Sequence, residues 1–400
     1  MKIFLALILM LAPVLPYAQT SLKNTPRGTF PVSEIVKQQE EEERRRQQQQ
    51  QQTPQPRRAS TISSAPVYTP VERPSVQPRT QPPAPQPQQQ PQRTVIITYV
   101  GQPYMRGNKK PAGMRGWPRK ALNIDAAKLT GAGVKIALFD SGASPNKELN
   151  GKVILYDITG KGNPSDESGH GTSIAGVLAG GSGSKFKSVA PDARIHSYKV
   201  TYQERAHDGQ ELTKTNNIYI REAVEEVLEY NRQRPDTRVD IINLSYGLDT
   251  PDKTLEDALR RAYDEGITIV AAAGNESRGA VLYPSAYDFV IGAGAINSDK
   301  QFTDFSNYGA GLDFVAPGQD IFSLDNKGGY DWWGGTSYSA AYITGVSALI
   351  IQAWQDKHGK KPTPRQVYET LVKISEPLPS VPGDKQGRGL PDASKIMGAV

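Results

Sequence analysis

The chain has 400 residues, no cysteine, and 47 Lys and Arg against 41 Asp and Glu, which gives a formal net charge of +6. The absence of cysteine excludes disulfides, thiolate metal sites and cysteine nucleophiles. Residues 19–120 hold 17 Lys and Arg against 6 Glu and no Asp, a net +11, and Lys2 adds one more positive charge, so residues 121–400 carry −6. A basic arm before a mildly acidic body gives no reason to expect a nucleic-acid-binding domain.

The first residues have the pattern of an export signal. Met1-Lys2 is a short basic start, Ile3–Leu15 is an apolar run, and the small residue Ala18 precedes Gln19. The apolar run is too short for a transmembrane helix. We therefore expect a signal peptide over residues 1–18, export to the periplasm or out of the cell, and no membrane attachment after its removal. A retained membrane anchor is the alternative.

Residues 19–116 are expected to form a low-complexity, Gln/Pro-rich basic arm and connector. A Glu/Arg block runs into six glutamines, Gln47–Gln52, and a Pro/Gln stretch follows to residue 93. Apolar residues are too sparse there to offset the entropy of ordering the chain, which predicts a disordered spacer. Thr94–Val100 is the one strand-like segment before the body, and a basic Gly/Pro-rich connector follows it.

Residues 117–400 alternate between continuous apolar runs and segments with helical periodicity. The runs predict buried strands over Val134–Phe139, Arg194–Val200, Val239–Leu244, Ile267–Ala272 and Phe289–Ala293. The periodic segments predict helices over Thr172–Leu178, Ile218–Tyr230, Leu255–Tyr263 and Tyr338–Trp354. This alternation predicts an α/β fold with a mostly parallel sheet covered by helices on both faces.

Four glycine-flanked motifs in this body supply an acid, a base, an amide donor and a nucleophile, in that order: Phe139-Asp140-Ser141-Gly142, Gly169-His170-Gly171-Thr172, Ala273-Gly274-Asn275-Glu276 and Gly335-Thr336-Ser337. Asp140 ends a predicted strand, where ligands gather in open α/β sheets. His170 is the residue type suited to proton transfer near neutral pH. Ser337 precedes a long helix whose first N–H groups can stabilise an oxyanion, and Asn275 can donate to the same oxyanion.

Each of these residues has an ordinary structural alternative when it is taken alone. Asp140 can cap the next turn, Asn275 can be a turn residue, Ser337 can be a helix N-cap, and His170 can simply begin a helix. The other three histidines are poorer candidates: His196 lies within a predicted strand, His207 in a polar insertion, and His358 at the end of a long helix.

Two further patterns carry less weight. Asn243-Leu244-Ser245-Tyr246-Gly247 is similar to a G-x-S-x-G nucleophile elbow, but it lacks the first glycine and only His358 follows it. An esterase built on Ser245 is therefore a remote alternative. Asp166-Glu167 is a weak hint of a calcium site, because a solvated charged surface is the default interpretation of such a pair. No metalloprotease or phosphate-binding motif is present.

Taken together, the four motifs resemble the subtilisin-like serine proteases, or subtilases, from about residue 117 to the end of the chain. Further segments add to the resemblance: Ala190–Ile195, Tyr283–Ala286, Phe305–Gly309, Val315–Gly318 and Gly387–Ala393. The resemblance implies that Asp140 orients His170, that His170 takes the proton of Ser337, and that Ser337 attacks a peptide carbonyl. Asn275 and the Ser337 N–H would then hold the oxyanion.

The same resemblance implies the substrate-binding residues. Leu244, Ser245, Tyr246 and Gly247 would pair with a polypeptide substrate as an added strand. Ala272, Ala273 and Gly274 would form one wall of the primary pocket, and Leu282 would narrow its base in place of the glycine common in the family. No cofactor is implied for the chemistry. A structural calcium ion and the oligomeric state are left open.

Three features depart from the family pattern: Ala341 replaces a proline, Tyr338 follows the nucleophile in place of a smaller or unbranched residue, and a low-complexity arm stands where a folded prodomain is usual. The sequence thus predicts an exported serine endopeptidase. The main alternative is a catalytically weak subtilase-fold scaffold that binds peptides or envelope components.

Overall fold

A computed structural model describes residues 112–181, 186–205 and 211–400 of the chain. The expected signal peptide and nearly all of the expected arm lie outside these residues. The described part is built on a seven-stranded parallel sheet. In spatial order its strands are β2 (Val153–Asp157), β3 (Arg194–Lys199), β1 (Lys135–Asp140), β6 (Ile241–Leu244), β7 (Thr268–Ala272), β8 (Ile291–Ile296) and β9 (Phe314–Pro317).

The strand order reverses direction at β1. From β1 the chain moves to one side to form β2 and β3, and it then crosses to the other side of β1 to form β6 and the strands after it. A crevice opens outside the carboxyl ends of the strands at such a switch point, and ligands bind there in open α/β sheets. Asp140 ends β1 at this position, and Ser245 follows the end of β6.

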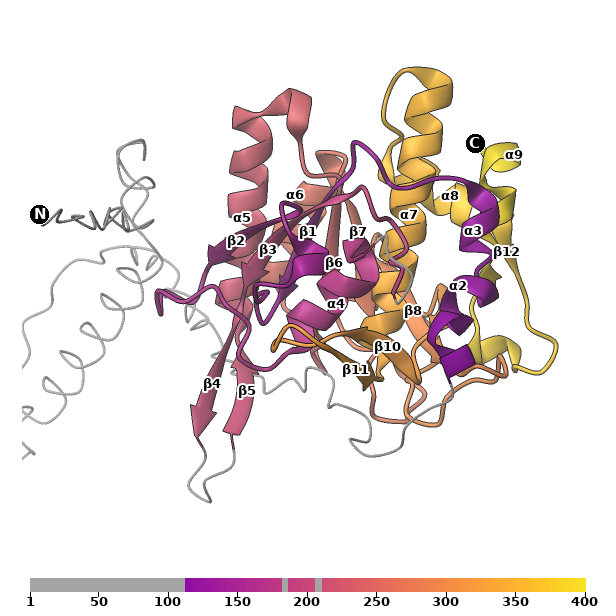
Figure 1. Cartoon of the computed structure of the whole chain (residues 1–400), viewed down its shortest axis with the longest axis horizontal. Helices are drawn as coiled ribbons and strands as arrows, with labels where there is room; N and C mark the ends of the chain where they lie inside the picture. The colour runs from indigo at the N-terminus through magenta and orange to yellow at the C-terminus, as the bar shows by residue number, and fades with distance from the viewer. Residues whose placement is uncertain (1–111, 182–185, 206–210) are drawn as a thin grey trace, which may run out of the picture. The chain divides into compact units, whose positions relative to one another are not determined.

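Helices cover both faces of the sheet, as the sequence predicts (Figure 1). Along β1, Ile136 and Leu138 belong to the apolar cluster on the side of α4 (His170–Ala179) and α7 (Thr336–His358). Ala137 and Phe139 belong to the cluster on the side of α5 (Asn217–Gln233) and α6 (Lys253–Asp264). This alternation follows from the two-residue period of a strand.

The remaining elements are short. Further helices are α2 (Trp117–Ala121), α3 (Ile124–Ala127), α8 (Pro364–Ile374) and α9 (Ile396–Ala399), with 3₁₀ turns η1 (Ala112–Gly116), η2 (Lys147–Leu149), η3 (Pro235–Thr237), η4 (Gly383–Lys385) and η5 (Ala393–Lys395). Antiparallel pairs are β4 (Thr201–Arg205) with β5 (Glu211–Thr215), β10 (Ile321–Leu324) with β11 (Tyr330–Trp333), and β12 (Ser375–Glu376) with β13 (Leu390–Pro391). The ribbon of β4 and β5 leaves the carboxyl end of β3 and projects from the body (Figure 1).

The predicted fold class is confirmed, while some element boundaries differ. Phe289 and Val290 precede β8, because a turn places Val290 N–H on the carbonyl of Tyr287 and the Phe289 ring stacks on the Tyr287 ring. The edge strands β2 and β9 and the three ribbons were not expected.

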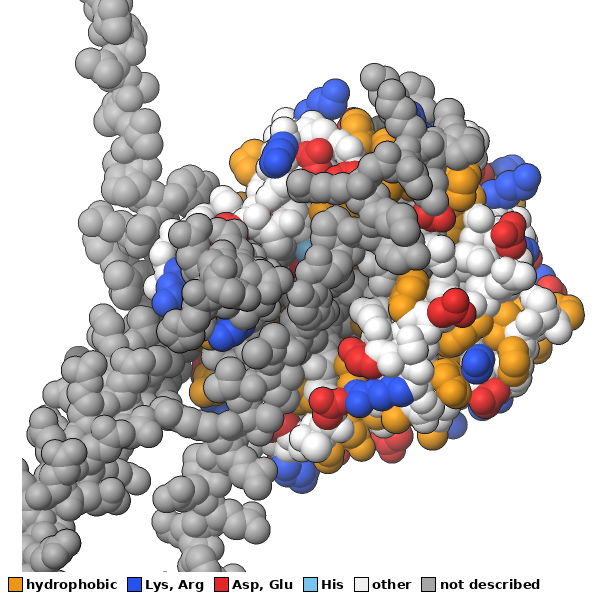
Figure 2. Space-filling view, turned by 90° about the horizontal axis from the view of Figure 1, so that it is seen from below, with side chains coloured by type: hydrophobic (Ala, Val, Ile, Leu, Met, Phe, Trp, Pro, Cys, Tyr) orange, Lys and Arg blue, Asp and Glu red, His pale blue; other side chains and the backbone are white. Residues whose placement is uncertain are grey.

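No described helix has the length and apolar character required to span a membrane. Where Figure 2 shows described residues, acidic and basic side chains are interspersed without a field of one sign.

Candidate active site

The predicted acid and base meet at the carboxyl end of β1. Asp140 is the last residue of β1, and His170 is the first residue of α4. Both side chains are buried, and His170 Nδ1 lies 2.7 Å from Asp140 Oδ1. Because the carboxylate only accepts, Nδ1 carries the proton and Nε2 presents its lone pair. Among the described residues His170 Nε2 has no hydrogen-bond partner, so it is free to accept a proton.

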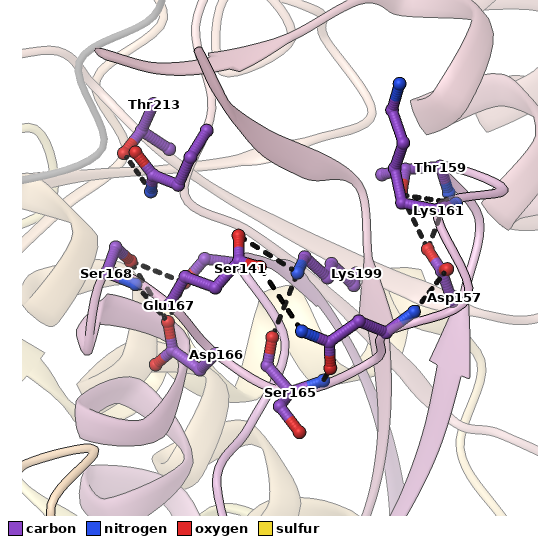
Figure 3. Close-up of polar contacts among 12 residues, drawn as sticks. Ser141, Asp157, Thr159, Lys161, Ser165, Asp166, Glu167, Ser168, Lys199 and Thr213 are labelled. Carbon is purple, nitrogen blue, oxygen red and sulfur yellow. Dashed lines mark hydrogen bonds and ion pairs between the residues drawn. The ribbon is translucent and has the colours of Figure 1, made fainter. Parts of the chain in front are cut away.

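A buried polar network holds the start of α4, and Figure 3 shows part of it. Asp166 Oδ1 accepts from the Gly169 N–H at 2.8 Å, and Oδ2 accepts from the Thr172 N–H and hydroxyl at 2.8 and 2.7 Å. The hydroxyl of Ser141 lies 2.8 Å from Asp166 Oδ1 and 3.2 Å from Asp140 Oδ1. The expectation of a solvated Asp166 is therefore wrong, because this side chain is buried and satisfies the N–H groups of Gly169 and Thr172 at the start of the helix.

Burial has electrostatic consequences in this network. Desolvation raises the pKa of Asp166 above its usual value, and the nearby charge of Asp140 raises it further, while the hydrogen bonds from Thr172 and Ser141 act in the opposite direction. The ammonium of Lys199, at the end of β3, lies 3.0 Å from the Ser165 carbonyl and 3.4 Å from a Glu167 carboxylate oxygen (Figure 3). Sequence spacing indicated none of these contacts, although Asp166 lies only four residues before His170.

Ser337 lies in the first turn of α7, one residue after the helix begins. The N-cap residue is Gly335, which has no side chain to cap the helix and has a φ of +132°, in the region that favours glycine. The N–H of Ser337 donates to no described residue, in keeping with the unpaired N–H groups at a helix start. The predicted nucleophile thus stands beside a free backbone donor.

Asn275 is oriented by the neighbour of the nucleophile. Its side-chain Oδ1 accepts from the Thr336 N–H at 2.9 Å and from the Thr336 hydroxyl at 3.0 Å. With the oxygen held in this way, the Nδ2 group faces away from Thr336 and donates to no described residue. A Cβ built on Gly335 would lie 3.7 Å from Nδ2, which places this amide at the start of α7. The role of Thr336 was not predicted, because nothing in the spacing joins residues 61 apart.

The residues predicted to contact substrate flank the same region. Leu244 ends β6, and Ser245, Tyr246 and Gly247 continue beyond the sheet. Ala272 ends β7, and Ala273 and Gly274 follow it. We call the segments that follow β6 and β7 the two strand exits. Leu282 and Tyr283 connect them: the Leu282 N–H donates to the Ala273 carbonyl at 2.9 Å, and Tyr283 exchanges two backbone hydrogen bonds with Leu248.

The Leu282 side chain lies between the two strand exits. A Cβ on Gly247 would collide with Leu282 Cδ1, and a Cβ on Gly274 would lie 2.8 Å from Leu282 Cγ. Leu282 is buried, yet it belongs to none of the apolar clusters, whereas its neighbour Val281 packs with Ala273 and Leu312. The side chain therefore packs against Gly247 and Gly274, in the segments that follow β6 and β7.

The histidines and the serine that the sequence ranked lower differ in their surroundings, and one of them lies outside the described residues. His196 is buried in β3, its Nδ1 lies 3.2 Å from the Tyr156 hydroxyl, and burial lowers its pKa to about 4. His358 ends α7 and packs on the Trp354 ring, and His207 lies outside the described residues. The buried hydroxyl of Ser245 has no hydrogen-bond partner among the described residues. No cluster of metal-binding side chains occurs in the described ranges.

Comparison with known proteins agrees with these observations. A model of the subtilase family matches residues 131–392. The chain is 33% identical over 225 residues to subtilisin BL of Lederbergia lenta, covering 56% of this chain and 78% of that protein. It is 32% identical over 298 residues to the major intracellular serine protease of Bacillus subtilis, covering 71% of this chain and 88% of that protein.

A third relative differs in length. The chain is 33% identical over 254 residues to the minor extracellular protease Epr of Bacillus subtilis, but the match covers only 35% of Epr. Since the family model covers more than half of the 400 residues, this protein belongs to the subtilase family.

Proposed function

We propose that the protein is an exported serine endopeptidase that hydrolyses peptide bonds through Asp140, His170 and Ser337. One observation carries this proposal. The buried contact of 2.7 Å between His170 Nδ1 and Asp140 leaves Nε2 unpartnered, at the switch point of the sheet where β1 ends. Family membership and the named serine proteases among the relatives support a peptidase.

The proposed reaction begins with proton transfer from the Ser337 hydroxyl to His170 Nε2. The Ser337 oxygen then attacks the peptide carbonyl carbon, and the negative charge that develops on the carbonyl oxygen is stabilised by Asn275 Nδ2 and the Ser337 N–H. His170 returns its proton to the leaving amine, which departs and leaves an acyl-enzyme. A water molecule, deprotonated by His170, hydrolyses the ester and restores Ser337. Asp140 stabilises the imidazolium in both halves of the reaction.

Substrate would be held at the two strand exits. Ser245–Gly247 extend past the sheet, and an extended polypeptide would lie beside them as an added strand. Leu282 would limit the size of the side chain before the cut.

The proposal also includes the N-terminal domain order, a signal peptide over 1–18 and an arm over 19–116 before the body. Export is supported by the basic and apolar pattern of the first residues.

Labelling with a fluorophosphonate probe tests the nucleophile. The wild-type protein and Ser245→Ala are expected to label, whereas Ser337→Ala is expected to be unlabelled with an unchanged melting temperature. Turnover of Ser337→Ala should fall by about 10⁶-fold, as loss of the nucleophile does in subtilisin itself. A folded wild-type protein that does not label would favour the catalytically weak scaffold, and loss of labelling only in Ser245→Ala would overturn the assignment.

A further inference from the structure

Tyr338, the residue after Ser337, joins the helix of the nucleophile to the helix of the base. Its side chain is completely buried, and its hydroxyl lies 2.6 Å from the hydroxyl of Ser173 in α4. Ser173 in turn donates to the carbonyl oxygen of His170 at 2.7 Å. A chain of two hydrogen bonds therefore runs from α7 to the backbone of the predicted base.

The direction of these two bonds follows from the protons available. The Ser173 hydroxyl has one proton and uses it on the His170 carbonyl, which can only accept. Tyr338 must therefore donate to Ser173 Oγ. Burial raises the pKa of Tyr338 well above its usual value, so the phenol keeps its proton throughout the neutral range. The link needs the tyrosine hydroxyl, and phenylalanine cannot supply it.

The ring of Tyr338 makes a second contact with the base. It stands edge-on to the His170 imidazole, with the ring centroids 5.8 Å apart and the planes at 67°. On another side the Trp333 ring lies 6.3 Å from Tyr338, and its Cη2 would be 3.1 Å from a Cβ on Gly169. The imidazole thus has an aromatic neighbour that is itself fixed between two elements.

We propose that Tyr338 is a positioning residue that couples α7 to α4 and restrains the His170 ring. Rotation of this ring would move Nδ1 away from Asp140 and change the direction in which the unpartnered Nε2 points, although the Asp140 contact does not involve Tyr338 directly. The proposal rests on the function proposed for the site. Tyr338 is also one of the positions at which this chain departs from the family pattern, where a smaller or unbranched residue is usual.

Tyr338→Phe, which keeps the ring and removes the hydroxyl, tests the proposal. Loss of one buried hydrogen bond predicts a fall in kcat of about threefold to tenfold with an unchanged KM. Tyr342→Phe is the matched control, because Tyr342 lies one turn further along α7, is also buried, and its hydroxyl bonds to no described residue. This control should keep the wild-type kcat. Ser173→Ala should reproduce the effect of Tyr338→Phe, and the double variant should be no worse than either.

A spectroscopic readout separates this proposal from the proposed function. The His170 Nδ1 proton, held on a carboxylate, should give a downfield proton resonance, measured in Ser337→Ala so that turnover plays no part. Adding Tyr338→Phe should broaden or shift this resonance, whereas adding Tyr342→Phe should not.

The outcomes are distinct. An unchanged resonance together with an unchanged kcat and a lower melting temperature would reduce Tyr338 to a core residue and overturn the proposal. If Tyr338→Phe does not fold, Ser173→Ala decides by the same two readouts. A wild-type protein without turnover, in which the resonance still responds to Tyr338→Phe, would contradict the proposed function and leave the positioning role supported.

Discussion

A buried carboxylate lies at each end of strand β1, and the two carboxylates have different partners. Asp140 belongs to β1, whereas Asp240 directly precedes β6. At the amino end, Asp240 accepts from the Lys135 N–H at 3.0 Å and contacts the Lys361 ammonium at 2.7 and 2.8 Å. At the carboxyl end, Asp140 contacts the His170 imidazole at 2.7 Å. Burial alone therefore does not identify a site for chemistry. What distinguishes the two ends is whether the partner is a fixed cation or a ring that can gain and lose a proton near neutral pH.

The surroundings of the two carboxylates differ as well. Desolvation raises the pKa of Asp240, and the charge of Lys361 offsets part of this effect. The pair thus offsets part of the cost of its own burial, as a structural ion pair does. Around Asp140 unsatisfied groups remain, because Asp140 Oδ2 and His170 Nε2 are both buried without a hydrogen-bond partner among the described residues. Unused hydrogen-bonding capacity next to a titratable ring is what a reaction centre requires.

The comparison is tested most strongly at the carboxyl end. Asp140→Asn removes the charge that holds the imidazole in one tautomer and stabilises its protonated form. We expect kcat to fall by about 10⁴-fold, with little change in the melting temperature. Initial rates on a peptide substrate, with thermal unfolding of the same preparation, measure both quantities. A variant that unfolds more easily but turns over normally would place Asp140 with Asp240 as a structural carboxylate.

The amino end should respond in the opposite way. Lys361→Ala leaves Asp240 buried without the ammonium that contacts it, so the free energy of unfolding should fall by about 3 kcal/mol near neutral pH while kcat stays at the wild-type level. Without the lysine the folded-state pKa of Asp240 rises further. The stability loss should therefore be small at acidic pH, where Asp240 is protonated in both folded proteins. It should grow as the pH rises above the folded-state pKa of Asp240 in the wild type, which lies above the ordinary carboxyl value of 3.8. Denaturant titrations at several pH values measure this, and a loss independent of pH would argue against an ion-pair role.

The smallest expected effect concerns the size of the pocket at the carboxyl edge. Leu282→Gly should open the space between Gly247 and Gly274 that the leucine side chain now occupies. We expect kcat/KM for substrates with Phe before the cut to rise about tenfold relative to those with Ala, the scale of one apolar size mismatch. A peptide library compared between the wild type and Leu282→Gly gives this ratio. A wild-type profile led by Phe or Tyr, unchanged in the variant, would show that Leu282 does not set specificity.

Much of the fold was predictable because its signals are local. Strands buried on both faces are continuous apolar runs, and the helices between them have their own periodicity. The segment Val134–Phe139 thus predicted β1 to within one residue at each end. Phe289 and Val290 were assigned to a strand because an apolar run does not show where pairing starts, and a turn at Tyr287 delays β8 to Ile291.

In the candidate site, too, some features were predictable from the sequence and others depend on the tertiary structure. The sequence by itself determined the residue types, their order and their places at strand and helix ends, since Asp140, His170 and Ser337 all adjoin such ends. Only the tertiary structure decided that Asp166 is buried, that Thr336 orients Asn275, that Leu282 stands between the strand exits, and that Tyr338 reaches Ser173. The last pair lies 165 residues apart along the chain. Contacts of this kind depend on how α4 and α7 pack on one face of the sheet, and no periodicity or spacing in the sequence encodes that distance.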